Sequence, residues 1–119
     1  MTGVKERSEQ RGRREDGTLA VETYRDGDGT TVLQLYGEFD LASAPTFEAE
    51  LTRAQSEVGP LVIDLSGLDF IDSTGISQLL AAHTRAEGEG RELAFLNGSP
   101  PVDRVLRLTG LDEILMFAD

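Results

Sequence analysis

Three oxygen-bearing side chains stand together between an apolar run and a helical pattern. They are Asp72, Ser73 and Thr74, and Gly75 follows them. Carboxylates and hydroxyls of this kind can cap a helix, act as acids, bases or nucleophiles, or accept a phosphoryl group. In an open α/β sheet, sites gather at this end of a strand. Two interpretations stay open at this point: Ser73 or Asp72 only caps the helix, or the segment is a functional site.

The spacing of these groups does not match the enzyme motifs that they suggest. Aspartyl-phosphate phosphatases use Asp-x-Asp-x-Thr, whereas Asp69, Asp72 and Thr74 are spaced Asp-x-x-Asp-x-Thr. One extra residue moves a carboxylate by over ~3 Å along an extended chain. No Gly-x-Ser-x-Gly elbow exists, and the single histidine, His83, falls on the apolar face of the next helical pattern. We therefore expect no enzyme and no catalytic residue, and Ser73 resembles a substrate more than a nucleophile.

Metal and cofactor motifs are missing from the sequence. It contains no cysteine and one histidine, and it has neither a Cys/His cluster nor a Walker loop. The turn at 26–29 does not fit a calcium loop, because Thr31 stands at the glycine position and Gly37 at the glutamate position. We expect no metal and no cofactor.

The acidic charge of the chain is unevenly distributed. The formal net charge is −11 over 119 residues. Residues 1–17 hold five basic and four acidic side chains, a net of +1, whereas residues 18–119 hold six and eighteen, a net of −12. Such a domain repels phosphate backbones and would suit a basic protein, although solubility is the commoner cause of acidity. We expect no nucleic-acid partner.

Length and composition predict one folded domain after a tail. Residues 1–17 hold one aliphatic side chain beyond Met1, namely Val4, so we expect a disordered tail there and a domain at residues 18–119. No apolar run approaches the length of a membrane span, and the N-terminus lacks the apolar stretch of a signal peptide. We therefore expect a cytoplasmic protein without a membrane partner.

Hydrophobic periodicity and turn residues predict an α/β fold. The expected sheet is mixed, mostly parallel and of about five strands, with an N-terminal hairpin and a cover of about three to four helices. The strand of residues 61–65 is apolar on both faces apart from Asp64, as a central parallel strand should be. Strands are expected at 19–25, 30–39, 61–65, 93–97 and 112–117, and helices at 43–58, 73–87 and 99–109.

Four segments resemble the anti-sigma factor antagonists, which are single STAS domains that control sporulation and stress sigma factors in bacteria. The resemblance covers about residues 19–117, and its most specific part is the Asp-Ser-Thr-Gly motif that ends at Gly75. One departure is Phe39, where leucine or isoleucine is more usual. The segments, in chain order, are 37–41, 61–68, 70–75 and 105–111.

The resemblance implies a phosphorylation switch. In such a switch the unphosphorylated antagonist binds an anti-sigma factor that is also a serine kinase with a GHKL-type ATP site, and the sigma factor is released. The kinase phosphorylates the serine at the position of Ser73, and a PP2C-type phosphatase reverses this. By position, Asp40, Asp72, Thr74 and Gly75 are implied to lie with Ser73 in the partner-binding site.

An alternative to the switch stays open. The chain could be a STAS scaffold or a regulatory subunit of a larger assembly in which Ser73 is never modified. In either case we expect a monomer or a weak dimer.

Overall fold

The structure is a computed structural model, and it describes residues 17–118. The expected tail therefore lies outside the described residues, apart from Gly17. Strands and helices alternate as the sequence predicts, with two short 3-10 helices, η1 and η2, added. In chain order the elements are β1 (Ala20–Arg25), β2 (Thr31–Phe39), η1 (Leu41–Ser43), α2 (Ala44–Gln55), β3 (Leu61–Ile71), α3 (Ser73–Gly88), β4 (Leu93–Leu96), α4 (Pro100–Thr109) and η2 (Leu111–Glu113).

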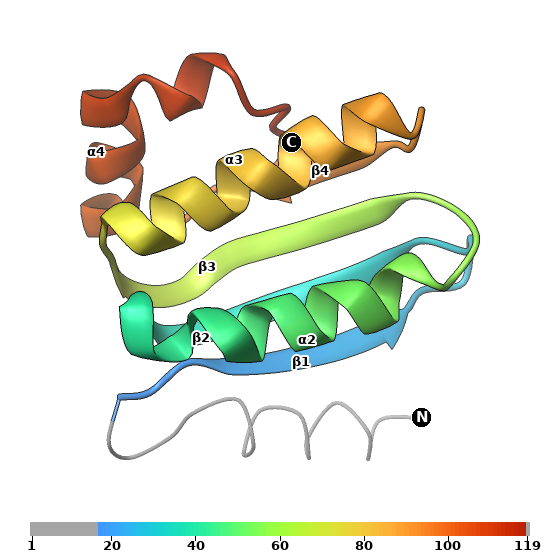
Figure 1. Ribbon diagram of the computed structural model, residues 1–119, viewed down its shortest axis with the longest axis horizontal. Helices are drawn as coiled ribbons and strands as arrows, with labels where there is room; N and C mark the ends of the chain where they lie inside the picture. The colour runs from blue at the N-terminus through green and yellow to red at the C-terminus, as the bar shows by residue number, and fades with distance from the viewer. Residues whose placement is uncertain (1–16, 119) are drawn as a thin grey trace.

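One mixed sheet of four strands, in the order β1-β2-β3-β4, forms the centre of the fold (Figure 1). The first pair is antiparallel and the other two pairs are parallel, which confirms the hairpin and the mostly parallel sheet. The expected fifth strand at 112–117 is wrong. Leu111 and Leu115 are both buried, and a spacing of four suits a helical turn, so only Phe117 reaches the sheet, through an isolated bridge to Phe95.

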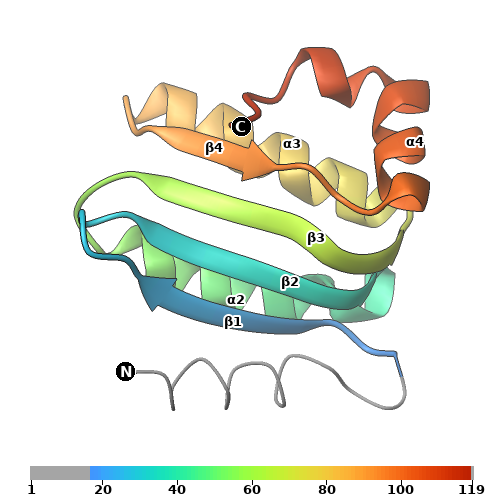
Figure 2. The same ribbon diagram turned by 180° about the vertical axis from the view of Figure 1, so that it is seen from behind.

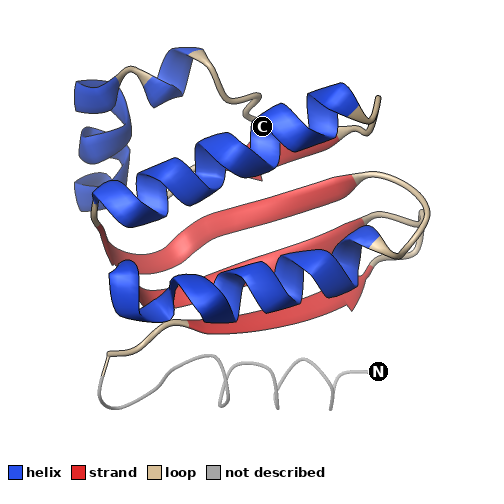
Figure 3. Cartoon of the chain, in the orientation of Figure 1, coloured by secondary structure: helices blue, strands red, loops and turns tan. Residues whose placement is uncertain are grey.

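Both long helices, α2 and α3, cover the same face of the sheet, and α4 packs at the end of β3 (Figures 1 and 3). Seen from behind, no helix covers the other face of the described sheet (Figure 2). Val62 and Asp64 point to that face and are half-buried. The strand that begins at residues 61–65 is an inner strand of the sheet, as its apolar character predicts, but the helices that cover the described sheet all lie on one side of it.

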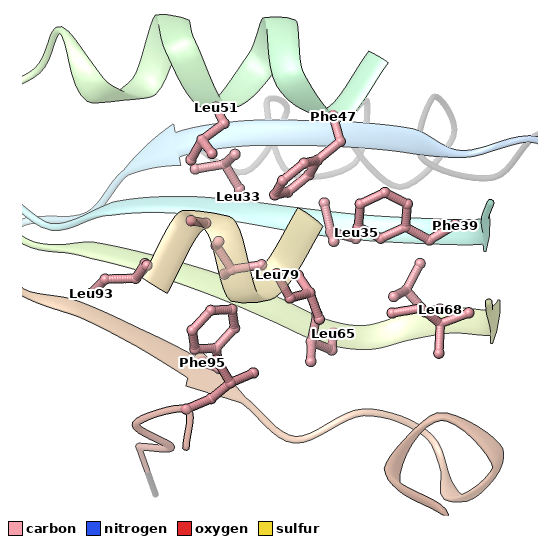
Figure 4. Close-up of a cluster of buried hydrophobic side chains, with 14 of the residues drawn as sticks. Leu33, Leu35, Phe39, Phe47, Leu51, Leu65, Leu68, Leu79, Leu93 and Phe95 are labelled. Carbon is pink, nitrogen blue, oxygen red and sulfur yellow. The ribbon is translucent and has the colours of Figure 1, made fainter. Parts of the chain in front are cut away.

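The core lies between the sheet and the α2–α3 layer. Leu33, Ile63 and Phe95 stand in register on three neighbouring strands and are fully buried. Phe39 packs against Phe47 of α2 with ring centroids 4.8 Å apart (Figure 4). Phe39 is thus a core residue, and its aromatic contact holds the end of β2 against the start of α2.

Helix α2 ends three residues earlier than the apolar pattern predicts. Its last residue is Gln55, and Val58 is 84 % exposed. The guanidinium of Arg91 donates to the carbonyls of Gln55 (2.6 Å), Gly59 (3.1 Å) and Glu57. Arg91 therefore holds the segment that follows α2 in a turn. The prediction that Val58 lies on the apolar face of the helix is wrong.

Strand β3 continues six residues beyond its expected end at 65. Its pairing with β2 shifts in register twice, between Gln34 and Tyr36 and between Gly37 and Glu38, and each shift places one extra residue on β3. The buried side chains of this part are consequently Leu65, Leu68 and Ile71, three residues apart instead of two. The extension carries the chain to the edge of the sheet where α3 begins.

A tight joint connects β3 to α3. The Asp72 N–H donates to the Phe39 carbonyl (3.1 Å), and the Asp72 carboxylate accepts from the N–H groups of Thr74 (2.8 Å) and Gly75 (3.1 Å). Of the two expected helix caps, Asp72 is therefore the one that the structure uses, and Ser73 is the first residue of α3. A Cβ on Gly75 would lie 2.6 Å from Ile71 Cγ1 and 2.8 Å from the Phe39 carbonyl oxygen.

The joint predicts opposite effects for two alanine substitutions in α3. Gly75→Ala should lower the free energy of unfolding by about 1–3 kcal/mol, because overpacking outweighs the helix propensity gained. Gly88→Ala is the matched control, since nothing lies within 4 Å of its added methyl group, and it should be neutral or stabilise by up to ~1 kcal/mol. Urea unfolding of both variants measures this, and an equally stable Gly75→Ala variant would contradict the described joint.

Candidate functional site

Ser73 lies exposed at the first position of α3, directly after the strand end. Its hydroxyl has no hydrogen-bond partner among residues 17–118. The capping function belongs to Asp72, so the hydroxyl of Ser73 is not needed to complete the helix. Thr74, next to it, is half-buried, whereas Ser77, one turn further on, is exposed as well.

Asp40 stands at the end of the neighbouring strand and caps η1. Its carboxylate oxygen Oδ1 accepts from the Ser43 N–H (3.1 Å), and the Asp40 N–H donates to Ser43 Oγ (2.9 Å). This reciprocal pair is a capping box, and the Ser43 hydroxyl also donates to the Glu38 carbonyl (3.1 Å). The carboxylate is half-buried and fixed in place at the carboxyl end of β2.

The ends of β2 and β3 bring the acidic residues of the motif to one edge of the sheet. Phe39 of β2 pairs with Ile71 of β3. Asp40 directly follows Phe39 and Asp72 directly follows Ile71, so the two aspartates stand at the ends of neighbouring strands. Exposed Glu38 and Asp69 lie just before them. A hollow of about 280 Å³ on the Asp40 side includes Glu38, Asp40 and Ser43 in its lining. The arrangement presents negative charge on both sides of the start of α3.

Two exposed apolar side chains at this edge were not singled out from the sequence. Leu41 is 74 % exposed and directly follows Asp40. Phe70 is 48 % exposed and lies three residues before Ser73. The register shift in β3 turns Phe70 away from the core, and no simple alternation reveals it. The buried Gly75 offers no side chain to a partner; its position lets α3 approach the Phe39 carbonyl.

The structure does not bring His83 to this edge. It follows Ser73 by ten residues on the same helix, about 15 Å along the axis. Its side chain is 13 % exposed, and Nε2 lies 3.4 Å from the Glu87 carboxylate. Its place agrees with the packed histidine that the sequence indicates.

The turn between β1 and β2 uses its aspartates internally. Asp26 Oδ1 accepts from the N–H groups of Asp28 (3.1 Å) and Thr30 (3.0 Å). Hydrogen bonding with Asp26, and then with Thr30, holds the pKa of Asp28 below its usual value.

Within the described part of the chain no group of three or more metal-ligating side chains comes together, and no helix is long and apolar enough to cross a membrane.

These features define a small α/β domain whose site is a surface: a free serine hydroxyl on an acidic sheet edge, flanked by exposed apolar side chains. The comparison with known families agrees with this class. Residues 21–119 match the STAS domain model, and the chain therefore belongs to the STAS domain family.

Several of the similar proteins are named anti-sigma factor antagonists. The anti-sigma F factor antagonist of Lysinibacillus sphaericus is 31% identical over 91 residues, covering 75% of this chain and 78% of its own. The crystal structure of an anti-sigma factor antagonist from Mycobacterium paratuberculosis superimposes with a TM-score of 0.76 at 28% identity, covering 90% of this chain and 92% of the other.

The Bacillus protein SpoIIAA is a further structural neighbour, solved in two forms. Its unphosphorylated form gives a TM-score of 0.68 at 26% identity and covers 84% of this chain and 89% of its own. Its phosphorylated form gives 0.63 at 26% identity and covers 84% and 92%. The SpoIIAA-like fold confirms the expected fold class.

The Asp40 capping box predicts how its carboxylate contributes to stability. Asp40→Asn keeps an acceptor oxygen for the Ser43 N–H, so its melting temperature should stay within about 2 °C of the parent. Asp40→Ala loses the cap and should cost about 0.5–2 kcal/mol, a fall of several degrees for a domain of this size. Thermal unfolding followed by circular dichroism distinguishes them. Equal losses in both variants would show that charge, not the cap, matters for stability.

Proposed function

We propose that this protein is an anti-sigma factor antagonist that is switched by phosphorylation of Ser73. The unphosphorylated form binds an anti-sigma factor that is also a GHKL-type serine kinase, and this binding releases the sigma factor. Phosphorylation of Ser73 ends the binding, and a PP2C-type phosphatase restores it. The protein acts in the cytoplasm, where sigma factors work.

The observation that carries this proposal is the exposed, unpartnered hydroxyl of Ser73 at the first position of α3. A kinase can reach it without unfolding the helix, because Asp72 already caps α3. The names of similar proteins support the role as an antagonist, and the two forms of SpoIIAA support phosphorylation as its control.

The electrostatics of the site favour a switch that acts on the partner and leaves the fold in place. A phosphate adds about −1.5 to −2 charges, and the N–H groups of Thr74 and Gly75 are already bonded to Asp72. The phosphate therefore stays in water in the free protein, and the domain remains folded. A partner that covers Ser73 must strip this water, at a cost of several kcal/mol. A loss of about 4 kcal/mol weakens binding roughly a thousandfold.

Kinase labelling with matched serine variants tests the proposal directly. Incubation with the cognate kinase should label the parent protein and Ser77→Ala, which lacks the other exposed serine of α3, and should leave Ser73→Ala unlabelled. Full labelling of Ser73→Ala would refute the assignment.

The same variants predict the binding behaviour. In titration calorimetry against the isolated kinase, Ser73→Ala should bind as the parent does and should resist inactivation by ATP. Ser73→Glu carries one charge instead of nearly two, so it should bind more weakly than the parent but more tightly than the phosphorylated protein. If Ser73→Glu and the parent bind equally well, the electrostatic switch is wrong.

The exposed apolar side chains predict where the partner gains affinity. Leu41→Ser and Phe70→Ser should each weaken binding about tenfold or more, since apolar and aromatic side chains at an interface centre often contribute 1–2 kcal/mol or more. Val58→Ser is the control, because Val58 is as exposed but precedes β3, at the opposite end of the sheet. A loss for Val58→Ser equal to the others would place the partner elsewhere.

A further inference from the structure

The sheet face that no described helix covers carries aromatic and acidic side chains (Figure 2). Alternation along the strands points Tyr24 of β1, Tyr36 of β2 and Asp64 of β3 to this face. Tyr24 is 40 % exposed, and the other two are half-buried. Asp64 pairs in register with Gln34, and Tyr24 pairs with Val32. The two tyrosines therefore flank the row of Asp64 on opposite sides along the strands.

The ring of Tyr36 lies against the neighbouring strand. Its hydroxyl donates to Gln34 Oε1 (3.2 Å), and a Cβ on Gly67 would lie only 2.5 Å from Tyr36 Cδ1. The ring thus uses the space that a side chain at residue 67 would need. Because Gln34 is the register partner of Asp64, an ordered and partly accessible aromatic ring is held next to a carboxylate.

Asp64 is the one charged residue in the apolar run that begins β3, and no described cation pairs with it. Its Oδ1 accepts from the Ser66 N–H (2.9 Å), whereas the ion pairs among residues 17–118 all involve other carboxylates. Burial, and then the charge of Asp64, raise the pKa of Tyr24. A half-buried carboxylate without a cation is unusual, because partial burial disfavours an unpaired charge.

The strands present no positive charge to this face. Residues 17–118 contain six arginines and no lysine, and Arg25 is the only one on a strand. Its guanidinium donates to Thr31 Oγ1 (3.4 Å) and to the carboxylate of Glu57 (3.0 Å), just after α2, so it serves the helix side of the sheet. The open face is therefore complementary to a positively charged group, in a domain whose residues 18–119 carry a net charge of −12.

We propose that Tyr24, Tyr36 and Asp64 form a second binding surface, which takes an arginine side chain from a basic segment of a partner protein. The guanidinium pairs with the free oxygen of Asp64 and packs against the Tyr36 ring. Arginine suits both contacts better than lysine, because its charge is spread over a planar group that stacks on aromatic rings. The inference goes beyond the proposed function, since this surface does not include Ser73.

Tyrosine fluorescence of the full chain tests the proposal. The chain contains two tyrosines and no tryptophan, and both tyrosines belong to this surface, so the signal reports on it alone. The probes are acetylated and amidated tetra-arginine and tetra-lysine peptides, titrated at low salt to limit screening. The arginine peptide should change the fluorescence and should bind about threefold more tightly than the lysine peptide.

Three variants separate the specific contacts from general attraction to an acidic protein. Asp64→Asn keeps an acceptor for the Ser66 N–H and should weaken binding of the arginine peptide about two- to fivefold. Tyr36→Leu should remove the preference for arginine over lysine, and Tyr24 still reports binding in this variant. Asp112→Asn is the charge-matched control, because Asp112 is exposed on η2, and it should bind as the parent does.

Three results would overturn the proposal. Equal losses in Asp64→Asn and Asp112→Asn, or equal binding of both peptides to the parent, would show attraction by net charge only. The absence of any response would show that the face does not accept a basic partner. Self-association of the parent that Asp64→Asn abolishes in analytical ultracentrifugation would assign the face to a second copy of the chain. None of these measurements uses a kinase, so failed labelling of Ser73 would overturn the proposed function alone.

Discussion

The hydrogen bond from the Asp72 N–H to the Phe39 carbonyl is the constraint on which the site depends. It joins the end of β2 to the turn that starts α3, and it can form only because Gly75 has no side chain to separate them. The packing of Phe39 against Phe47 of α2 holds the end of β2 in place. The position of Ser73 is therefore set by packing and backbone bonding, while its own hydroxyl remains unused.

The division of tasks between adjacent residues explains how one short motif can combine stability with exposure. Asp72 satisfies the first N–H groups of α3, a task that a serine could also perform. Because the carboxylate performs it, modification of Ser73 does not remove a cap. Asp40, directly after β2, likewise has two functions: it closes a capping box and also contributes negative charge to the surface.

Local patterns in the sequence were sufficient where periodicity and caps follow simple rules. The hairpin, the start of α3 at the Asp72–Ser73 step and the end of α4 at Thr109 agree with the expected elements. Side-chain contacts between distant segments were not predictable in this way. Arg91 holds the turn after α2 from 32 to 36 residues away, and no pattern near Val58 indicates that the helix stops before it. The exposure of Leu41 and Phe70 likewise follows from chain geometry that the sequence does not display.

The second register shift in β3 has a consequence for how relatives of this chain should be aligned. Leu68 faces Gly37 and Phe70 faces Glu38, so Asp69 is the residue without a partner on β2. Removal of Asp69 would leave Leu68, Phe70 and Ile71 alternating inward, outward and inward, as in a regular strand. A homologue one residue shorter at this point can therefore keep the same core and the same serine position. A single-residue gap at this point of an alignment therefore indicates a strand without the bulge. Asp69, the acidic residue that the bulge exposes, can be lost without a change in the joint between β3 and α3.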